Sequence, residues 1–224
     1  MTTEYTNADD QLTPHPQQRE VSHDENHDNS NEEVEVVPKP FTKEDALRLI
    51  SINQIEFTIP DTFTYIANDM VFTPFKSLET IIIPESITSI GKYSFLGCSA
   101  LKNINLPDSI TSIGGVSFNS CSALQDINLP ASITSIEWGT FAHCSSLSSI
   151  TVPDTVTQIG AHAFLNCRSL TFITISDAAL NNPNYGISAL GEYCDPFAEC
   201  TELIAIAQTL NMTVKEYFYH LNKV

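Results

Sequence analysis

The sequence predicts a mainly β fold with short helical or 3₁₀ turns: a solenoid capped by short α-helices and preceded by a disordered acidic N-terminal tail. Three observations predict this fold. A 23-residue repeat aligns the same apolar residue types through the middle of the chain, as in stacked arrays. Acidic residues gather before the repeat, and apolar residues at helical spacing flank it on both sides. We therefore expect a tail over 1–40, a capping helix over 41–53, the solenoid over 54–206 and a helical cap over 207–224.

The expected tail is acidic and has almost nothing to bury. The chain of 224 residues has 27 Asp and Glu against 10 Lys and Arg, which gives a formal net charge of −17. Ten of these acids, but only two basic residues, lie in residues 1–40. So few apolar side chains cannot offset a backbone entropy cost of about 1–2 kcal/mol per residue, and we expect this segment to be disordered.

The capping helix has a recognisable start. Thr42 and Asp45 have the spacing of a capping box, with Asp in place of the usual Glu or Gln. Apolar residues then follow at helical spacing, from Ala46 to Ile50. This pattern predicts a helix of about three turns that covers the first coil of the solenoid.

The repeat consists of columns of identical residues, each 23 residues after the last. The columns are leucine (Leu78, Leu101, Leu124, Leu147, Leu170), cysteine (Cys98, Cys121, Cys144, Cys167), phenylalanine (Phe95, Phe118, Phe141, Phe164) and proline (Pro84, Pro107, Pro130, Pro153). Agreement among several columns indicates one structural unit per repeat. Such a unit completes its core only by stacking on its neighbours.

Each unit begins with a short strand. Ile81 and Ile83 alternate with Ile82, so we expect the first two to point inward and Ile82 to point outward. Pro84 has no backbone N–H to donate to a ladder, and we expect it to end the strand and turn the chain.

The rest of the unit closes the coil. Ile87 and Ile90 predict a second extended segment with two inward side chains. Phe95, Cys98 and Leu101 follow at three-residue spacing, which is typical of a helical or 3₁₀ turn.

Less regular units flank the regular ones. Upstream, Phe75 takes the place of cysteine in a unit that starts near Phe57. Downstream, Cys200 follows Cys167 by 33 residues, an excess of ten over the repeat. We place most of this insertion at 178–186 and expect the pattern to resume at Ile187, Leu190, Gly191 and Phe197.

These residues resemble the BspA-like family of leucine-rich repeats. The matching unit reads Leu78-x-x-Ile81-x-Ile83-Pro84-x-x-Ile87-x-x-Ile90-Gly91-x-x-x-Phe95-x-x-Cys98. The resemblance covers about residues 54–206. It implies a mostly β leucine-rich-repeat solenoid used for protein binding or adhesion, with no enzyme activity and no cofactor. Members of the family are often secreted or exposed at the cell surface.

The glycine column departs from this pattern at one place. Gly91, Gly114 and Gly160 align with Glu137, which lies beside Trp138. Either the position does not require positive φ, or the third unit has a locally different turn.

The C-terminal segment predicts two helices. We expect Thr201 to cap the first, whose apolar face runs from Leu203 to Leu210. Thr213 and Glu216 form a full capping box for the second. We expect these helices to cover the unpaired strand edge of the last coil, in preference to docking on a partner.

No constellation predicts catalysis or metal binding. The repeated cysteines share one inward column, no C-x-x-C occurs, and a buried thiol is a small apolar filler. Cys194 and Cys200 are the pair expected to react if any does. His143 and His162 occupy different phases of the repeat and so do not stack. No nucleophile, phosphate-loop or paired-acid motif is present. We therefore expect no enzyme, no metal and no cofactor.

Two outward columns on the first strand of each unit form the predicted interaction surface. They make a polar, nearly uncharged strip with apolar residues at its ends, and a solvated sheet face is the alternative interpretation. The candidate protein-binding residues are Asn103, Asn105, Asp126, Asn128, Ser149, Thr151, Phe172 and Thr174.

The preferred hypothesis is a non-catalytic scaffold that mediates protein–protein interaction through this exposed sheet face. The acidic balance argues against nucleic acid and anionic membrane as partners. No apolar run reaches the length of a membrane span and no signal peptide is visible, so we expect a cytoplasmic monomer with reduced cysteines. The alternative is a BspA-like cell-surface adhesin or antigen. A hydrolase in the 178–200 insertion around Cys194 is the weakest hypothesis, because no base is placed beside the thiol.

Overall fold

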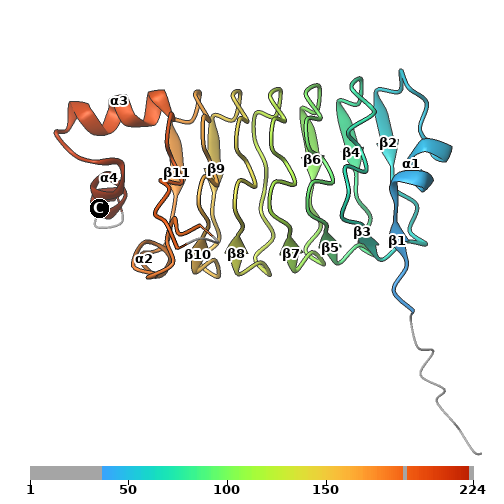
Figure 1. Cartoon of the computed structure of the whole chain (residues 1–224), viewed down its shortest axis with the longest axis horizontal. Helices are drawn as coiled ribbons and strands as arrows, with labels where there is room; N and C mark the ends of the chain where they lie inside the picture. Colours follow the sequence, from blue (N-terminus) through green and yellow to red (C-terminus); the bar gives the residue numbers. More distant parts are fainter. Residues whose placement is uncertain (1–36, 189–190, 222–224) are drawn as a thin grey trace, which may run out of the picture. The chain divides into compact units, whose positions relative to one another are not determined.

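A computed structural model describes residues 37–188 and 191–221. Disorder predicted for the acidic tail therefore falls mostly outside the described residues. From residue 37 onward the chain forms successive coils that lie side by side (Figure 1). Each regular coil contributes two extended sides, which pair in parallel with the neighbouring coils, and a third side made of turns. The structure confirms the predicted solenoid.

Short parallel strands form two ladders along the coils. The first ladder contains β2 (Glu56–Thr58), β4 (Thr80–Ile82), β6 (Asn103–Asn105), β9 (Ser149–Thr151) and β11 (Phe172–Thr174). The second ladder contains β1 (Pro40–Phe41), β3 (Tyr65–Ile66), β5 (Ser89–Ile90), β7 (Ser112–Ile113), β8 (Ser135–Ile136) and β10 (Gln158–Ile159). Identical repeat positions pair with each other, as in Ile81 with Ile104 and Ile90 with Ile113. The repeat length is therefore one full coil.

Backbone hydrogen bonds join neighbouring coils in both directions. In the second ladder, the amide of Thr111 donates to the carbonyl of Thr88 in the preceding coil at 2.9 Å. On the third side, the amide of Phe95 donates to the carbonyl of Ser117 in the following coil, also at 2.9 Å. Both the ladders and the third side therefore contribute hydrogen bonds between neighbouring coils.

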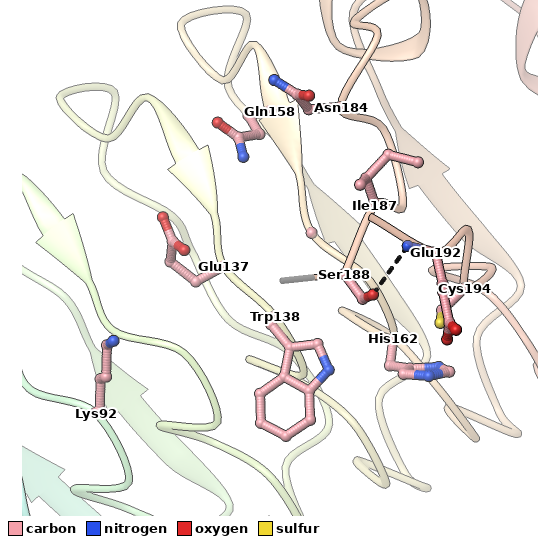
Figure 2. Close-up of a pocket in the computed structure, with 11 residues that line it drawn as sticks. Lys92, Glu137, Trp138, Gln158, His162, Asn184, Ile187, Ser188, Glu192 and Cys194 are labelled. Carbon is pink, nitrogen blue, oxygen red and sulfur yellow. Dashed lines mark hydrogen bonds between the residues drawn. The ribbon is translucent and has the colours of Figure 1, made fainter. Parts of the chain in front are cut away.

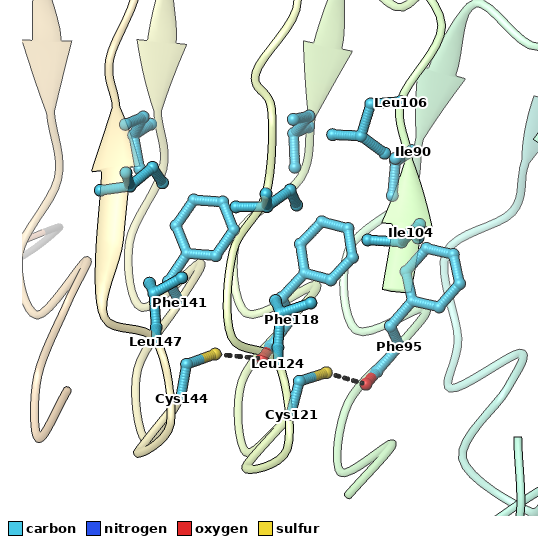
Figure 3. Packing of buried hydrophobic residues seen from close by; sticks show 14 of the residues in the cluster. Ile90, Phe95, Ile104, Leu106, Phe118, Cys121, Leu124, Phe141, Cys144 and Leu147 are labelled. Atoms are coloured by element: carbon cyan, nitrogen blue, oxygen red, sulfur yellow. Dashed lines mark hydrogen bonds between the residues drawn. The ribbon is translucent and has the colours of Figure 1, made fainter. Parts of the chain in front are cut away.

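The predicted inward columns form the core (Figure 3). The rings of Phe95 and Phe118 stack with centroids 5.0 Å apart, and the stack continues from Phe72 to Phe197. The thiol of Cys121 donates to the carbonyl of Phe95 at 3.2 Å. Its counterparts in later coils repeat this bond. The thiols therefore fill the interior in one row, donate to backbone carbonyls and, among the described residues, form no disulfide.

Both ladders are interrupted between the same two coils. β7 and β8 belong to separate sheets, as do β6 and β9. Between β6 and β9, residues 126–128 make only an isolated bridge, from Asn128 to Thr151. The third side continues across the interruption, since the amide of Phe118 donates to the carbonyl of Thr140 at 3.0 Å.

The glycine column is required by close contact between coils. A Cβ on Gly114 would lie 2.6 Å from the amide nitrogen of Lys92, and a Cβ on Gly160 would lie 2.6 Å from that of Trp138. Gly91, Gly114 and Gly160 are not among the described residues with positive φ. The position therefore does not require positive φ, and Glu137 occupies it in the coil where the ladders break.

The N-terminal end of the array starts earlier than the predicted boundary at residue 40. Pro40 and Phe41 of β1 pair with β3, and the amide of Lys39 donates to the hydroxyl of Thr64 at 2.7 Å. The helix α1 (Lys43–Leu49) follows, with seven residues, about two turns rather than three. Thr42 and Asp45 form the predicted capping box.

The pKa of Asp45 reflects this box. Partial burial acts to raise it, but hydrogen bonds from the backbone and hydroxyl of Thr42 and the charge of Arg48 lower the pKa below its usual value. The ionised carboxylate is therefore the form that holds the start of α1.

The insertion has a different register from the predicted one. The amide of Gly186 donates to the carbonyl of Ile159 at 2.9 Å, as Gly160 does to Ile136. Buried Tyr185 and Gly186 therefore take the column positions that the sequence assigned to Leu190 and Gly191. The expected insertion at 178–186 is only partly correct: this segment contains the short helix α2 (Asp177–Leu180), and most of the extra residues lie between Gly186 and Phe197. Leu190 lies outside the described residues.

Two helices close the C-terminal end. The helix α3 (Thr201–Thr209) begins five residues before the predicted end of the solenoid at 206, and its N-cap is Cys200 rather than Thr201. The helix α4 (Val214–Leu221) has the predicted capping box, with the Glu216 amide donating to the Thr213 hydroxyl at 3.2 Å. Phe218 of α4 meets Phe197 edge-on at 5.0 Å. The helical cap therefore ends the stack of phenylalanine rings.

Candidate functional site

The candidate binding residues lie together on the outer face of the first ladder. We call them, with Thr80 and Ile82, the outward strip. Asn103 pairs with Thr80 and Asn105 with Ile82. The other members are Asp126, Asn128, Ser149, Thr151, Phe172 and Thr174. All of the candidates are exposed except Ser149, which is half-buried.

The outward strip offers unused hydrogen-bonding groups. Among the described residues, the side-chain amides of Asn103, Asn105 and Asn128 have no intramolecular hydrogen-bond partner. Each amide carries two N–H donors and a carbonyl acceptor. These groups therefore face solvent and are available to another molecule.

Apolar groups lie at both ends of the strip. Ile82 is 41% exposed and Phe172 is 50% exposed. A shallow hollow of about 180 Å³ lies between β4, β6 and Asp126, where the first ladder is interrupted. The strip is nearly uncharged. Lys102 and Glu79 form a nearby ion pair at 2.9 Å and together add no net charge. The surface combines apolar contact with neutral hydrogen-bonding groups.

The interior cysteines are poor nucleophiles. Burial raises the pKa of Cys98 and of Cys144 to about 12, so the reactive thiolate is scarce at neutral pH. Cys194 is half-buried, whereas Cys200 lies in the interior row. In the part of the chain that the structure describes, no group of three or more His, Cys, Asp or Glu side chains could hold a metal ion.

A second concave surface lies on the side of the second ladder. It was not predicted from the sequence. Its volume is about 810 Å³, and we call it the Trp138 groove (Figure 2). It is lined by Trp138 and Gln158 from the coils and by Asn184 and Glu192 from the insertion. Two signals could have pointed to it: Glu137 breaks the glycine column beside the chain's one tryptophan, and ten extra residues follow.

The repeats match a known family model. The model describes a BspA-type leucine-rich repeat region, and six copies of it cover residues 66–186, more than half of the chain. The chain belongs to the BspA-type leucine-rich repeat family. This finding confirms the resemblance drawn from the repeat columns.

Solved structures resemble this BspA-type repeat protein over part of its length. A leucine-rich repeat protein from T. pallidum aligns with a TM-score of 0.53 and 30% identity over 55% of this chain and 59% of that chain. A leucine-rich repeat protein from Bacteroides ovatus has 29% identity over 55% and 38% of the two chains, with a TM-score of 0.44. One from Eubacterium ventriosum has 27% identity over 56% and 40%, with a TM-score of 0.48.

These alignments cover less than two thirds of each of the three related proteins. No match was found among the curated proteins. Among the described helices of the BspA-type repeat protein, none has both the length and the apolar character needed to cross a membrane.

Proposed function

We propose that this BspA-type repeat protein is a non-catalytic scaffold that binds a protein partner through the outward strip. The observation that carries the proposal is the in-register pairing of outward residues, between β4 and β6 and between β9 and β11. Asn105 lies beside Ile82 in this pairing, and an isolated bridge places Asn128 beside Thr151, so that unpartnered asparagine amides share one face with their neighbours. A protein backbone offers the complementary donors and acceptors at regular spacing.

The energetic anchors of such an interface are its exposed apolar groups. Phe172 and Ile82 are large enough to fill pockets on a partner, and buried aromatic anchors dominate protein interfaces. The asparagines between them would add hydrogen bonds and set register. Since the strip is nearly uncharged, its binding should depend little on salt.

Charge favours a protein over other macromolecules. The net charge of −17 repels the phosphates of nucleic acid and of anionic lipid. A protein without strong negative charge meets no such barrier. We expect the scaffold itself to act as a monomer, with the strip free for its partner.

The test is affinity capture with the full chain and two matched double variants. Asn105→Arg with Asn128→Arg places two charges on the outward strip. Thr134→Arg with Thr157→Arg places the same charges on exposed positions of the second ladder. We expect wild type and the Thr134/Thr157 variant to recover the same proteins, and the Asn105/Asn128 variant to lose them. Recovery of one common set by all three chains, or of no protein by folded wild type, would refute the proposal.

A further inference from the structure

We infer that the Trp138 groove is a binding site for a neutral sugar ring. Its volume of about 810 Å³ lies within the range of small-molecule pockets, roughly 300–1,000 Å³. The groove lies between the coils that carry β8 and β10 and the insertion that follows Gly186 (Figure 2). It is separate from the outward strip, so the inference does not rest on the function proposed for that strip.

The indole of Trp138 is uncovered because of its neighbours in the repeat. On the third side, the Val116 amide donates to the carbonyl of Trp138, and the Gly139 amide donates to that of Ala161, both at 3.0 Å. The equivalent bond one coil earlier ends on Gly115. Gly115, Trp138 and Ala161 are therefore equivalent positions, and neither neighbour has a side chain large enough to cover the ring. Trp138 is 50% exposed as a result.

The position of Trp138 is set by the backbone. Its carbonyl accepts the hydrogen bond from Val116, and a Cβ on Gly160 would already lie 2.6 Å from its amide nitrogen. Tight packing against the neighbouring coils leaves the backbone at this position little freedom to shift. A ligand that stacks on the indole therefore binds a side chain whose backbone is already fixed in position.

Polar side chains share the groove with the indole of Trp138. In Figure 2, Glu137 lies to one side of Trp138, Gln158 and Asn184 lie above it, and Glu192 lies on the other side. Among the described residues, the side-chain amides of Gln158 and Asn184 have no intramolecular hydrogen-bond partner. The site therefore offers donors and acceptors around an exposed aromatic face.

This chemistry selects among ligand classes. An anionic ligand would meet the carboxylates of Glu137 and Glu192, with Lys92 as the one cation in the lining. A wholly apolar ligand would bury the amides without partners. A pyranose ring has a face of C–H groups that can stack on an indole, and its hydroxyls both donate and accept hydrogen bonds. A neutral sugar therefore satisfies the aromatic and the polar groups together.

The chain provides its own reporter for a binding test, because Trp138 is its one tryptophan. The purified full chain is titrated with the methyl glycosides of glucose, galactose, mannose and N-acetylglucosamine while tryptophan emission is followed. We expect at least one glycoside to change the emission saturably in the millimolar range. An oligolysine peptide is titrated in parallel, and we expect no saturable change from it.

Variants then locate the site by ligand-observed NMR with the glycoside that binds. We expect Trp138→Ala to weaken its affinity by about tenfold or more, because the stacking contact is lost, and Asn184→Ala to weaken it less. Leu47→Ala removes an exposed apolar side chain that does not line the groove and should leave affinity unchanged. Urea midpoints check that each variant is folded.

Three results would overturn the inference: no glycoside gives a saturable change, Trp138→Ala and Leu47→Ala have equal effects, or the oligolysine peptide alone saturates the signal. The last result would identify the groove as a site for basic peptides.

Discussion

Glu137 carries a side chain at the repeat position where Gly160, one coil later, has only backbone. The Gly160 amide donates to the carbonyl of Ile136 at 2.8 Å and so helps to join β10 to β8. Glu137 directly follows β8, and β8 belongs to a different sheet from β7. Because a Cβ at the equivalent Gly114 would lie 2.6 Å from the preceding backbone, the residue at this position controls how closely two coils approach.

Replacing Glu137 by glycine should therefore restore the missing ladder. We expect Glu137→Gly to slow hydrogen exchange of the amide at position 137 and of the β8 amides, as they gain partners in β7. Glu137→Ala removes the carboxylate but keeps the Cβ, so its exchange rates should remain close to those of wild type. Equal exchange rates in both variants, measured by NMR, would contradict the role given to the Cβ.

The stacked rings should dominate stability. Phe118 is fully buried between Phe95 and Phe141, and Phe118→Ala should cost about 3–5 kcal/mol because it leaves a cavity. Phe172→Ala removes the same side chain from an exposed position and should change the free energy of unfolding by less than about 0.5 kcal/mol. Urea unfolding measures both, and a similar effect of the two variants would be evidence against the stack as the core.

Adjacent glycines should differ in their tolerance of a methyl group. A Cβ on Gly114 would lie 2.6 Å from the Lys92 amide nitrogen, whereas the nearest atom to a Cβ on Gly115 is the Trp138 carbonyl oxygen at 3.0 Å. We expect Gly114→Ala to destabilise the protein by about 1–3 kcal/mol through overpacking, and Gly115→Ala by less. The prediction fails if thermal unfolding ranks the two variants in the opposite order.

The interior thiols should weaken the fold at alkaline pH. Burial raises the pKa of Cys98 and Cys144 from 9.0 to about 12, so the folded state holds these protons more tightly than the unfolded chain does. Their contribution to stability is complete below about pH 9 and is lost as pH rises toward about 12. Urea unfolding under reducing conditions should show this decline.

Cys144→Ser is the matched variant for the alkaline decline. Its hydroxyl can still donate to the carbonyl of Phe118, as the thiol does at 3.2 Å, but it does not ionise in this range. The free energy of unfolding of Cys144→Ser should therefore fall less steeply with pH. An equally steep decline would show that the thiols are not its source.

The interior of the coils was predictable because one repeat equals one coil. Ile81, Phe95 and Cys98 recur at a fixed interval, and in-register pairing then stacks each on its counterpart. The same alternation that places Ile81 inside places Asn103 and Asn105 outside. Both the core and the face of the outward strip could therefore be read from spacing alone.

Contacts outside the period could not be predicted in this way. β1 is two residues long and borders the acidic tail, and only its pairing with Tyr65 and Ile66 identifies it. Leu190 and Gly191 have the residue types of the repeat, but the hydrogen bond from Gly186 to Ile159 sets the actual register. The Trp138 groove depends on where the insertion folds back, and spacing contains no information on that.

The directions of the hydrogen bonds between coils have an electrostatic consequence. In an α-helix all peptide dipoles point the same way and sum to a macrodipole. Here the ladders contain bonds of both directions, since Thr111 donates backward to Thr88 and Ile59 donates forward to Ile82, whereas Phe95 and Phe118 on the third side both donate forward. The third side therefore carries the part of the peptide dipoles that adds from coil to coil.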